Sequence, residues 1–159
     1  MELYIQIDKI KGEVTESAHK EWIKIHNYSF GVQSEGVEDP SARGKLVSAA
    51  GNYSPIVFHK TTDITSPMLQ QLASEGTHIA KVTIHACLDN SAKVPANEIE
   101  LTDVVISGYA MSASEGGDPS ETVELRYAKI KVTSRNFDEK GQKKTEPSFT
   151  WDLTQKKKA

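Results

Sequence analysis

The stretch that decides the fold is Thr65–Gly76, TSPMLQQLASEG, because it is the only segment whose pattern predicts an α-helix. Ser66 offers a side-chain oxygen to a free first-turn N–H, and Pro67 follows at the first helical position, where its missing donor costs nothing. Gly76 offers the left-handed residue that commonly ends a helix. A helix of about ten residues does not persist alone in water, so other elements must hold it.

One face of this helix is predicted to attach it to the rest of the protein. A single apolar stripe is formed by residues at helical spacing: Met68, Leu69, Leu72 and Ala73. Most of the chain on either side of the helix alternates between apolar and polar residues, which indicates strands. The sequence therefore predicts a mainly β domain with one helix packed on its side through this stripe.

The predicted strands change phase in three places. They cover Glu2–Ile7, Glu21–Val32, Pro55–Lys60, His78–Cys87, Glu98–Met111, Glu121–Phe137 and Pro147–Thr154. The inward-facing parity switches at His26–Asn27, near Asp103, where we expect two strand pieces to join, and between Tyr127 and Ile130; such a switch is typical of a bulge. About seven to nine strands without a repeat or linker predict a single domain over residues 1–159, either a barrel or a sandwich.

The segment from Ser34 to Ser54 has no sustained period and is rich in glycine and small polar residues. Loops of this length in compact domains are usually functional or disordered. Its large apolar residues need a surface to pack on, and that surface can belong to another chain: Val37, Leu46, Val47 and Tyr53. We therefore expect this loop to take part in self-association.

Composition excludes some classes of partner. The chain has 19 basic and 22 acidic residues, a net charge of −3, so general attraction to nucleic acid or to anionic membranes is not expected. Residues 1–128 carry 10 basic and 18 acidic side chains, whereas residues 129–159 carry 9 and 4. This asymmetry suits a polyanion, a complementary copy of the same chain, or simply a lopsided solvated surface. The Lys156–Lys158 run is most simply a frayed terminus.

Localisation signals are few. The single cysteine, Cys87, excludes an internal disulfide and suits a reducing compartment. No apolar run approaches the roughly 20 residues that span a bilayer. The first residues, MELYIQIDK, enter a strand without the pattern of a signal peptide. We expect synthesis in the cytoplasm and, if the protein is exported, a machine that needs no cleaved signal.

Candidate residues for chemistry do not converge in the sequence. His85 and Cys87 share one face of a strand, but a zinc site needs three or four ligands, and the other histidines are scattered singly: His19, His26, His59 and His78. Cys87 is therefore expected to be a small buried thiol. Neither hydrolase, phosphate-loop nor zinc-protease motifs are present, and Asp63 and Glu75 flank the helix as surface residues. The sequence predicts no catalytic, metal or cofactor site.

Several stretches, taken together and in order, resemble a known family. They are HKEWIKIHNYSFGV (19–32), IVFHKTTDITSPMLQQLASEGTHIAKVTIHAC (56–87), IELTDVVISGYAMS (99–112), ETVELRYAKIKV (121–132) and FTWDLTQKKK (149–158). Each is weakly specific alone, but the ordered set resembles the haemolysin-coregulated protein (Hcp) family, the inner-tube subunit of the bacterial type VI secretion system.

The resemblance implies a small β-barrel of two antiparallel sheets with one flanking α-helix and a long extended loop. It also implies a structural subunit, not an enzyme, that forms homohexameric rings. The rings would stack into a tube that a contractile sheath propels out with a spike protein, carrying small effectors in the lumen. The protein would start in the bacterial cytoplasm and be secreted or delivered into target cells, without membrane insertion.

Two other functions are compatible with a small β domain. One is a monomeric β-barrel that binds a small ligand or acts as an adaptor, and the other is a phage-type tail tube subunit. A native mass separates the first from a ring-forming protein, since a heterologous ring requires several copies. The second shares the tube architecture, and genomic neighbours would distinguish it.

Overall fold

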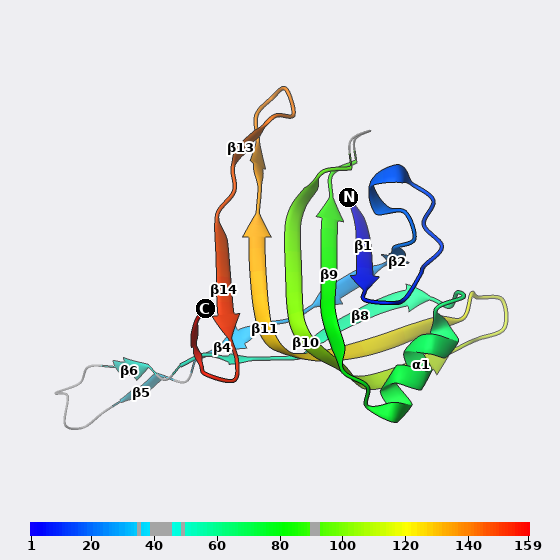
Figure 1. The fold of residues 1–159 in the computed structure, drawn as a ribbon, viewed down its shortest axis with the longest axis horizontal. Helices are drawn as coiled ribbons and strands as arrows, with labels where there is room; N and C mark the ends of the chain where they lie inside the picture. The colour runs from blue at the N-terminus through cyan, green and yellow to red at the C-terminus, as the bar shows by residue number, and fades with distance from the viewer. Residues whose placement is uncertain (35, 39–45, 49, 90–92) are drawn as a thin grey trace.

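The structure is a computed structural model that describes residues 1–34, 36–38, 46–48, 50–89 and 93–159; the side chains of residues 37, 38 and 46–48 are not included. The described residues fold mainly as strands, with one α-helix, α1 (Ser66–Glu75), and one short 3-10 helix, η1 (Ser17–His19). Helix α1 flanks the strands on one side, and a narrow hairpin extends away from them on the other (Figure 1). The predicted fold class, a mainly β domain with one flanking helix, is confirmed.

All ladders between the described strands are antiparallel. In chain order the strands are β1 (Glu2–Ile7), β2 (Ile23–Ile25), β3 (Asn27–Ser29), β4 (Val32–Gln33), β5 (Gly36–Glu38), β6 (Leu46–Ser48), β7 (Asn52–Tyr53), β8 (Ile56–Thr61), β9 (Ile79–Cys87), β10 (Pro95–Ser112), β11 (Ser120–Ser134), β12 (Asn136–Phe137), β13 (Lys143–Thr145), β14 (Ser148–Asp152) and β15 (Lys157–Lys158).

The strand pairings follow a circuit around a barrel. Strand β1 pairs with β9, β9 with β10, β10 with β11, β11 with β8, and β8 with β3. The chain then connects β3 back through His26 to β2, which pairs with β1. The change of face predicted at His26–Asn27 is therefore confirmed, and it marks the junction between two strands with different partners.

The two longest strands, β10 and β11, bend and contribute to both halves of the barrel. Two strand pieces joined near Asp103 were expected, but β10 is a single strand from Pro95 to Ser112. Asp103 adopts a left-handed backbone with a φ of 54°, and the register shifts between Ile106 and Gly108. A left-handed residue and a bulge can redirect a strand while its pairing continues, so the strand changes face without ending.

Alternate residues of these strands fill the barrel with apolar side chains. The fully buried ones come from every part of the circuit and include Ile5, Phe58, Ile84, Leu101, Leu125 and Ile130. They form one contiguous cluster with the buried residues of the neighbouring strands. The interior of the barrel is therefore a packed core, which agrees with the period-two pattern of the sequence.

Helix α1 ends as predicted but begins differently. Gly76 has a φ of 64° and its N–H donates to the carbonyl of Leu72, which confirms the left-handed C-cap. The N-cap residue is Thr65, not Ser66, and its side chain makes no capping bond. The Ser66 hydroxyl instead accepts a hydrogen bond from the Asp63 N–H at 2.9 Å and donates to Glu121 at 3.0 Å. The expectation for Ser66 was wrong because a buried carboxylate uses its hydroxyl.

The helix packs on the barrel through a narrower stripe than the sequence suggests. Leu69 is 0% exposed within the core, and Leu72 and Ala73 are half-buried against it. Met68, by contrast, is 44% exposed. The helix packs mainly on β10, so Leu69 is the central anchor of this contact.

A buried ion pair ties the start of α1 to the barrel. Lys60 of β8 is 0% exposed, and its ammonium contacts the buried Glu121 of β11 and lies 2.9 Å from Asp63. Glu121 also accepts hydrogen bonds from Ser66 and from the Tyr109 hydroxyl. Asp63, which was expected at the surface, is thus a partner of a buried cation. A lysine within a strand pattern gave no sign of this arrangement.

The described residues between Gly31 and Ser54 include short strands that pair, although the sequence has no period. Strand β4 pairs with β7, and β5 pairs with β6, in a hairpin that projects from the barrel (Figure 1). We call the described residues within 32–53 the arm. The extended loop of the prediction therefore contains short ladders that the pattern of the sequence does not indicate. Backbone pairing needs no apolar alternation where a hairpin has no core of its own to cover.

The depth of Leu69 predicts a sharp contrast with its neighbour on the helix. Leu69→Asp should lower the free energy of unfolding by several kcal/mol, or prevent folding, because it buries an unpaired carboxylate where apolar contacts were lost. Met68→Asp should change it by less than about 0.5 kcal/mol, as exposed substitutions usually do. Urea unfolding followed by circular dichroism measures both, and equal effects would contradict the packing described for α1.

The buried ion pair predicts a second contrast. Lys60→Met should lower the free energy of unfolding by about 3–5 kcal/mol, because it leaves Glu121 and Asp63 without their cation. Lys81→Met is the matched control: its ammonium lies 3.0 Å from Glu100, but its side chain is largely exposed, so the loss should be below about 1 kcal/mol. Similar losses in the two variants, measured in urea, would show that the Lys60 pair is not buried as described.

Candidate functional site

The base of the arm is fixed to the barrel by hydrogen bonds. The Ser54 N–H donates to the Gly31 carbonyl at 2.9 Å, and the Gly31 N–H donates to the Ser54 hydroxyl at 2.8 Å. The Tyr127 hydroxyl of β11 donates to the Ser54 carbonyl at 2.8 Å. The two ends of the arm are therefore held together at the barrel surface, while the β5–β6 end extends outward.

The predicted self-association residues all lie on this arm. Val37 and Val47 are direct partners in the β5–β6 ladder, and Leu46 pairs with Glu38. The side chains of Val37, Leu46 and Val47 lie outside the described part of the structure. Tyr53, at the base, pairs with Val32 and packs half-buried against the core. The arm thus brings the four residues into one projecting element.

An aromatic patch lies beside the arm base and was not predicted. It consists of Tyr53, Phe149 and Trp151, with Trp151 6.4 Å from Tyr53 and 6.0 Å from Phe149 between ring centroids. Phe149 is exposed. Among the described residues, the indole N–H of Trp151 is a buried side-chain group without a hydrogen-bond partner, and such groups are uncommon in folded proteins. The patch combines exposed apolar surface with an unused donor.

One strand edge near α1 is also open. The pairing of β10 with β9 ends at Val104 opposite Ile79, but β10 continues to Ser112 with β11 on its other side. In the part of the chain that the structure describes, no further strand pairs with this outer edge, and Met111 on it is exposed. An open edge is a ready template for pairing with another chain.

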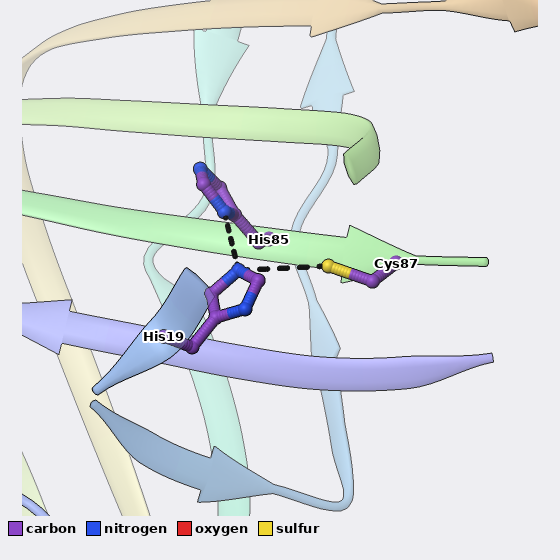
Figure 2. A group of neighbouring side chains, drawn as sticks. All are labelled: His19, His85 and Cys87. Atoms are coloured by element: carbon purple, nitrogen blue, oxygen red, sulfur yellow. Dashed lines mark hydrogen bonds between the residues drawn. The ribbon is translucent and has the colours of Figure 1, made fainter. Parts of the chain in front are cut away.

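A group of two imidazoles and a thiol lies on the outer face of the barrel wall. His19 Nε2 is 2.9 Å from His85 Nδ1 and 3.6 Å from Cys87 Sγ, so three potential ligand atoms converge (Figure 2). All three lie within 4.8 Å of one another. The sequence pattern placed His85 and Cys87 on one face of a strand, but His19 was expected to stand alone. The structure brings His19 to them from η1, 66 residues away in sequence.

Carboxylates hold the far side of both imidazoles. His19 Nδ1 lies 2.9 Å from Glu16, which also accepts the Ala18 N–H at 2.7 Å as the N-cap of η1. His85 Nε2 lies 3.1 Å from Glu98, its cross-strand neighbour in β10. The backbone N–H of Ala18 and the His19 ring hold the pKa of Glu16 below its usual value. Each ring is therefore oriented by an acidic group behind it.

Burial is the main cause of the pKa shifts of His85 and Cys87. Loss of water lowers the pKa of His85 to about 4, even though the nearby Glu98 acts in the opposite direction. Burial raises the pKa of the Cys87 thiol to about 11, and the charge of Glu16 adds to the increase. At neutral pH, and with no other ion bound, His85 is neutral and Cys87 is a thiol.

No α-helix in the part of the chain described here is long and apolar enough to cross a membrane. A search among curated proteins finds no match. Comparisons with family models and with solved structures do find relatives, and they agree with one another.

The family model described as "Type VI secretion system effector, Hcp" matches residues 4–133. The structure of a type six secretion system protein superposes with a TM-score of 0.92 at 25% identity, covering 99% of both chains. Hcp1 from Salmonella typhimurium gives a TM-score of 0.80 at 19% identity, covering 99% of this chain and 98% of that one. A type VI secretion system effector from Yersinia pestis gives 0.74 at 23% identity, covering 94% and 98%.

The two structures below 25% identity show a shared fold, and the family model matches well over half of the sequence. The chain that carries the projecting arm, the flanking helix and the bent β10–β11 pair can therefore be assigned to a known family. The protein belongs to the Type VI secretion system effector, Hcp, family.

Proposed function

We propose that this chain is the subunit of a homohexameric ring, and that the rings stack into the inner tube of a type VI secretion system. In this function the tube is propelled by a contractile sheath with a spike protein, and small effectors travel in its lumen. The protein is made in the bacterial cytoplasm and leaves the cell as part of the tube. Membership in the Hcp family supports this role, and the arm is the observation on which the assembly proposal depends.

The geometry of the arm favours contact with other copies. Its β5–β6 end projects from the barrel (Figure 1), so a single subunit gives it little apolar surface to pack on. Ordering each residue's backbone opposes folding by roughly 1–2 kcal/mol, whereas burying a large apolar side chain returns about 1.5–3 kcal/mol. The arm has too few large apolar residues to gain this free energy from contacts within one chain. Contacts with a neighbouring subunit can supply the rest.

A ring needs two different surfaces on each subunit, because each copy contacts its neighbours head to tail. The arm with the aromatic patch is one such surface. The open edge of β10 beyond Val104, with its exposed Met111, is suited to be the other. An added strand on this edge would satisfy free backbone groups. This pair of surfaces supports a closed ring of identical subunits.

The packed interior disfavours a monomeric ligand-binding barrel. Ile5, Phe58 and Leu125 occupy the inside of the barrel and are fully buried, so a ligand would have to displace the core. The absence of predicted catalytic residues agrees with a structural role. A phage-type tail tube would use the same surfaces, but the family match favours the secretion tube.

The proposal predicts a native mass six times that of the 17.5 kDa chain. The double substitution Leu46→Asp and Val47→Asp should leave a folded barrel that is monomeric, because two charges would be placed in the contact between subunits. Native mass spectrometry measures the assembly, and circular dichroism measures the fold.

The matched control is Gln142→Asp with Thr145→Asp, which adds the same two negative charges to the exposed β12–β13 hairpin. This control should assemble like the parent. A parent that is only monomeric at micromolar concentration would contradict the ring. A Leu46/Val47 variant that unfolds, or that assembles normally, would show that the arm is not the contact.

A further inference from the structure

We propose that His19, His85 and Cys87 bind a divalent transition-metal ion of the zinc class, with the fourth coordination position left to water or a small ligand. This site is separate from the surfaces proposed for assembly. Its support comes from the spacing of the three ligand atoms, the groups behind them and the way the protein holds them.

The spacing of the three ligand atoms is close to the spacing of ligands around one shared ion. Zinc binds histidine nitrogen at about 2.0–2.1 Å and cysteine sulfur at about 2.3 Å, so tetrahedral ligands lie about 3.3–3.7 Å apart. The separations from His19 Nε2 are 2.9 Å to His85 Nδ1 and 3.6 Å to Cys87 Sγ. The remaining pair lies within 4.8 Å. The two nitrogens are closer together than this range, so a bound ion would have to push the two imidazoles slightly apart.

The groups behind the histidines leave lone pairs directed at this point. A neutral imidazole has one N–H and one lone pair. Glu16 and Glu98 each accept from the far nitrogen of a ring, at 2.9 Å and 3.1 Å. The two near nitrogens are hydrogen-bonded to each other at 2.9 Å, so a proton lies between them, and a metal ion would replace this proton and use both lone pairs. Carboxylates that orient histidines in this way are typical of metal sites.

The pocket holds the rings in place before an ion binds. Tyr4 stacks on His19 with ring centroids 4.4 Å apart, and the Trp22 ring contacts both imidazoles at 4.8 Å and 4.5 Å. His19 and Cys87 are buried, whereas the His85 side chain is 15% exposed. His85 therefore marks the side from which an ion can enter. Little conformational freedom would be lost on binding.

The donor set selects the class of metal. Imidazole and thiolate favour zinc and similar ions, whereas magnesium and calcium prefer oxygen. Binding of the ion would release the proton of the Cys87 thiol to solvent. The resulting thiolate, Glu16 and Glu98 would then supply three negative charges for a divalent ion, and Arg135 adds one positive charge at 3.3 Å from Glu98. A bound ion would also join η1 to strand β9, two segments far apart in the sequence, and so stabilise the folded subunit.

Cobalt provides a spectroscopic test, because Co²⁺ occupies zinc sites and its bond to a thiolate absorbs strongly in the near ultraviolet. Chelator-treated protein titrated with Co²⁺ should develop this band up to one ion per chain, and Zn²⁺ should abolish it. The same ions should raise the melting temperature. A parent protein without the band at stoichiometric Co²⁺ would overturn the proposal and would mean that a proton alone bridges the two rings.

Variants identify the ligands. Cys87→Ser should remove the band, and Glu98→Gln should weaken Co²⁺ binding by about 10–100-fold, the usual effect of losing a carboxylate behind a histidine. The matched control is His78→Asn, which removes an exposed histidine that lies 2.8 Å from Asp103 and should leave the titration unchanged. Undiminished Co²⁺ binding in a folded Cys87→Ser protein would overturn the assignment.

Discussion

The pairing between β10 and β11 is the constraint on which the rest of the structure depends. Its register runs from Asn97 opposite Ser134 to Ser112 opposite Ser120, so one ladder passes through both halves of the barrel. One half of this ladder is flanked by β9 and β14, and the other by β8. The bend is possible because Asp103 takes a left-handed backbone and the register shifts after Ile106. Without this ladder the barrel could not close.

Two polar clusters use opposite ends of these strands, and they differ in one physical respect. Around Glu121 every charge has a partner, because Lys60 lies between Glu121 and Asp63. Around Glu98 and Glu16 the carboxylates are satisfied by the histidines, but two imidazole nitrogens face each other. Polar groups removed from water need partners. The first cluster is therefore complete within the chain, and the second needs a proton or a metal ion.

The strands were predictable because the alternation of apolar and polar residues that indicates a strand involves only residues adjacent in sequence. The expected strand His78–Cys87 matches β9 (Ile79–Cys87), and Gly76 ends the helix as its backbone freedom suggests. The remaining features depend on contacts between distant segments. The burial of Lys60 and the approach of His19 to His85 arise from the topology, which a linear pattern does not contain. The pairing of the arm was missed because its strands cover no core and therefore show no apolar alternation.

The arm links this fold to the proposed tube, since a projecting hairpin gains its packing surface from a neighbour. The central claim is that the folded subunit closes into rings. Negative-stain electron microscopy of the purified protein tests it most directly. We predict ring-shaped particles whose class averages show sixfold symmetry, with stacked rings as the protein concentration rises. Fields that contain only single compact particles at micromolar concentration would contradict the claim.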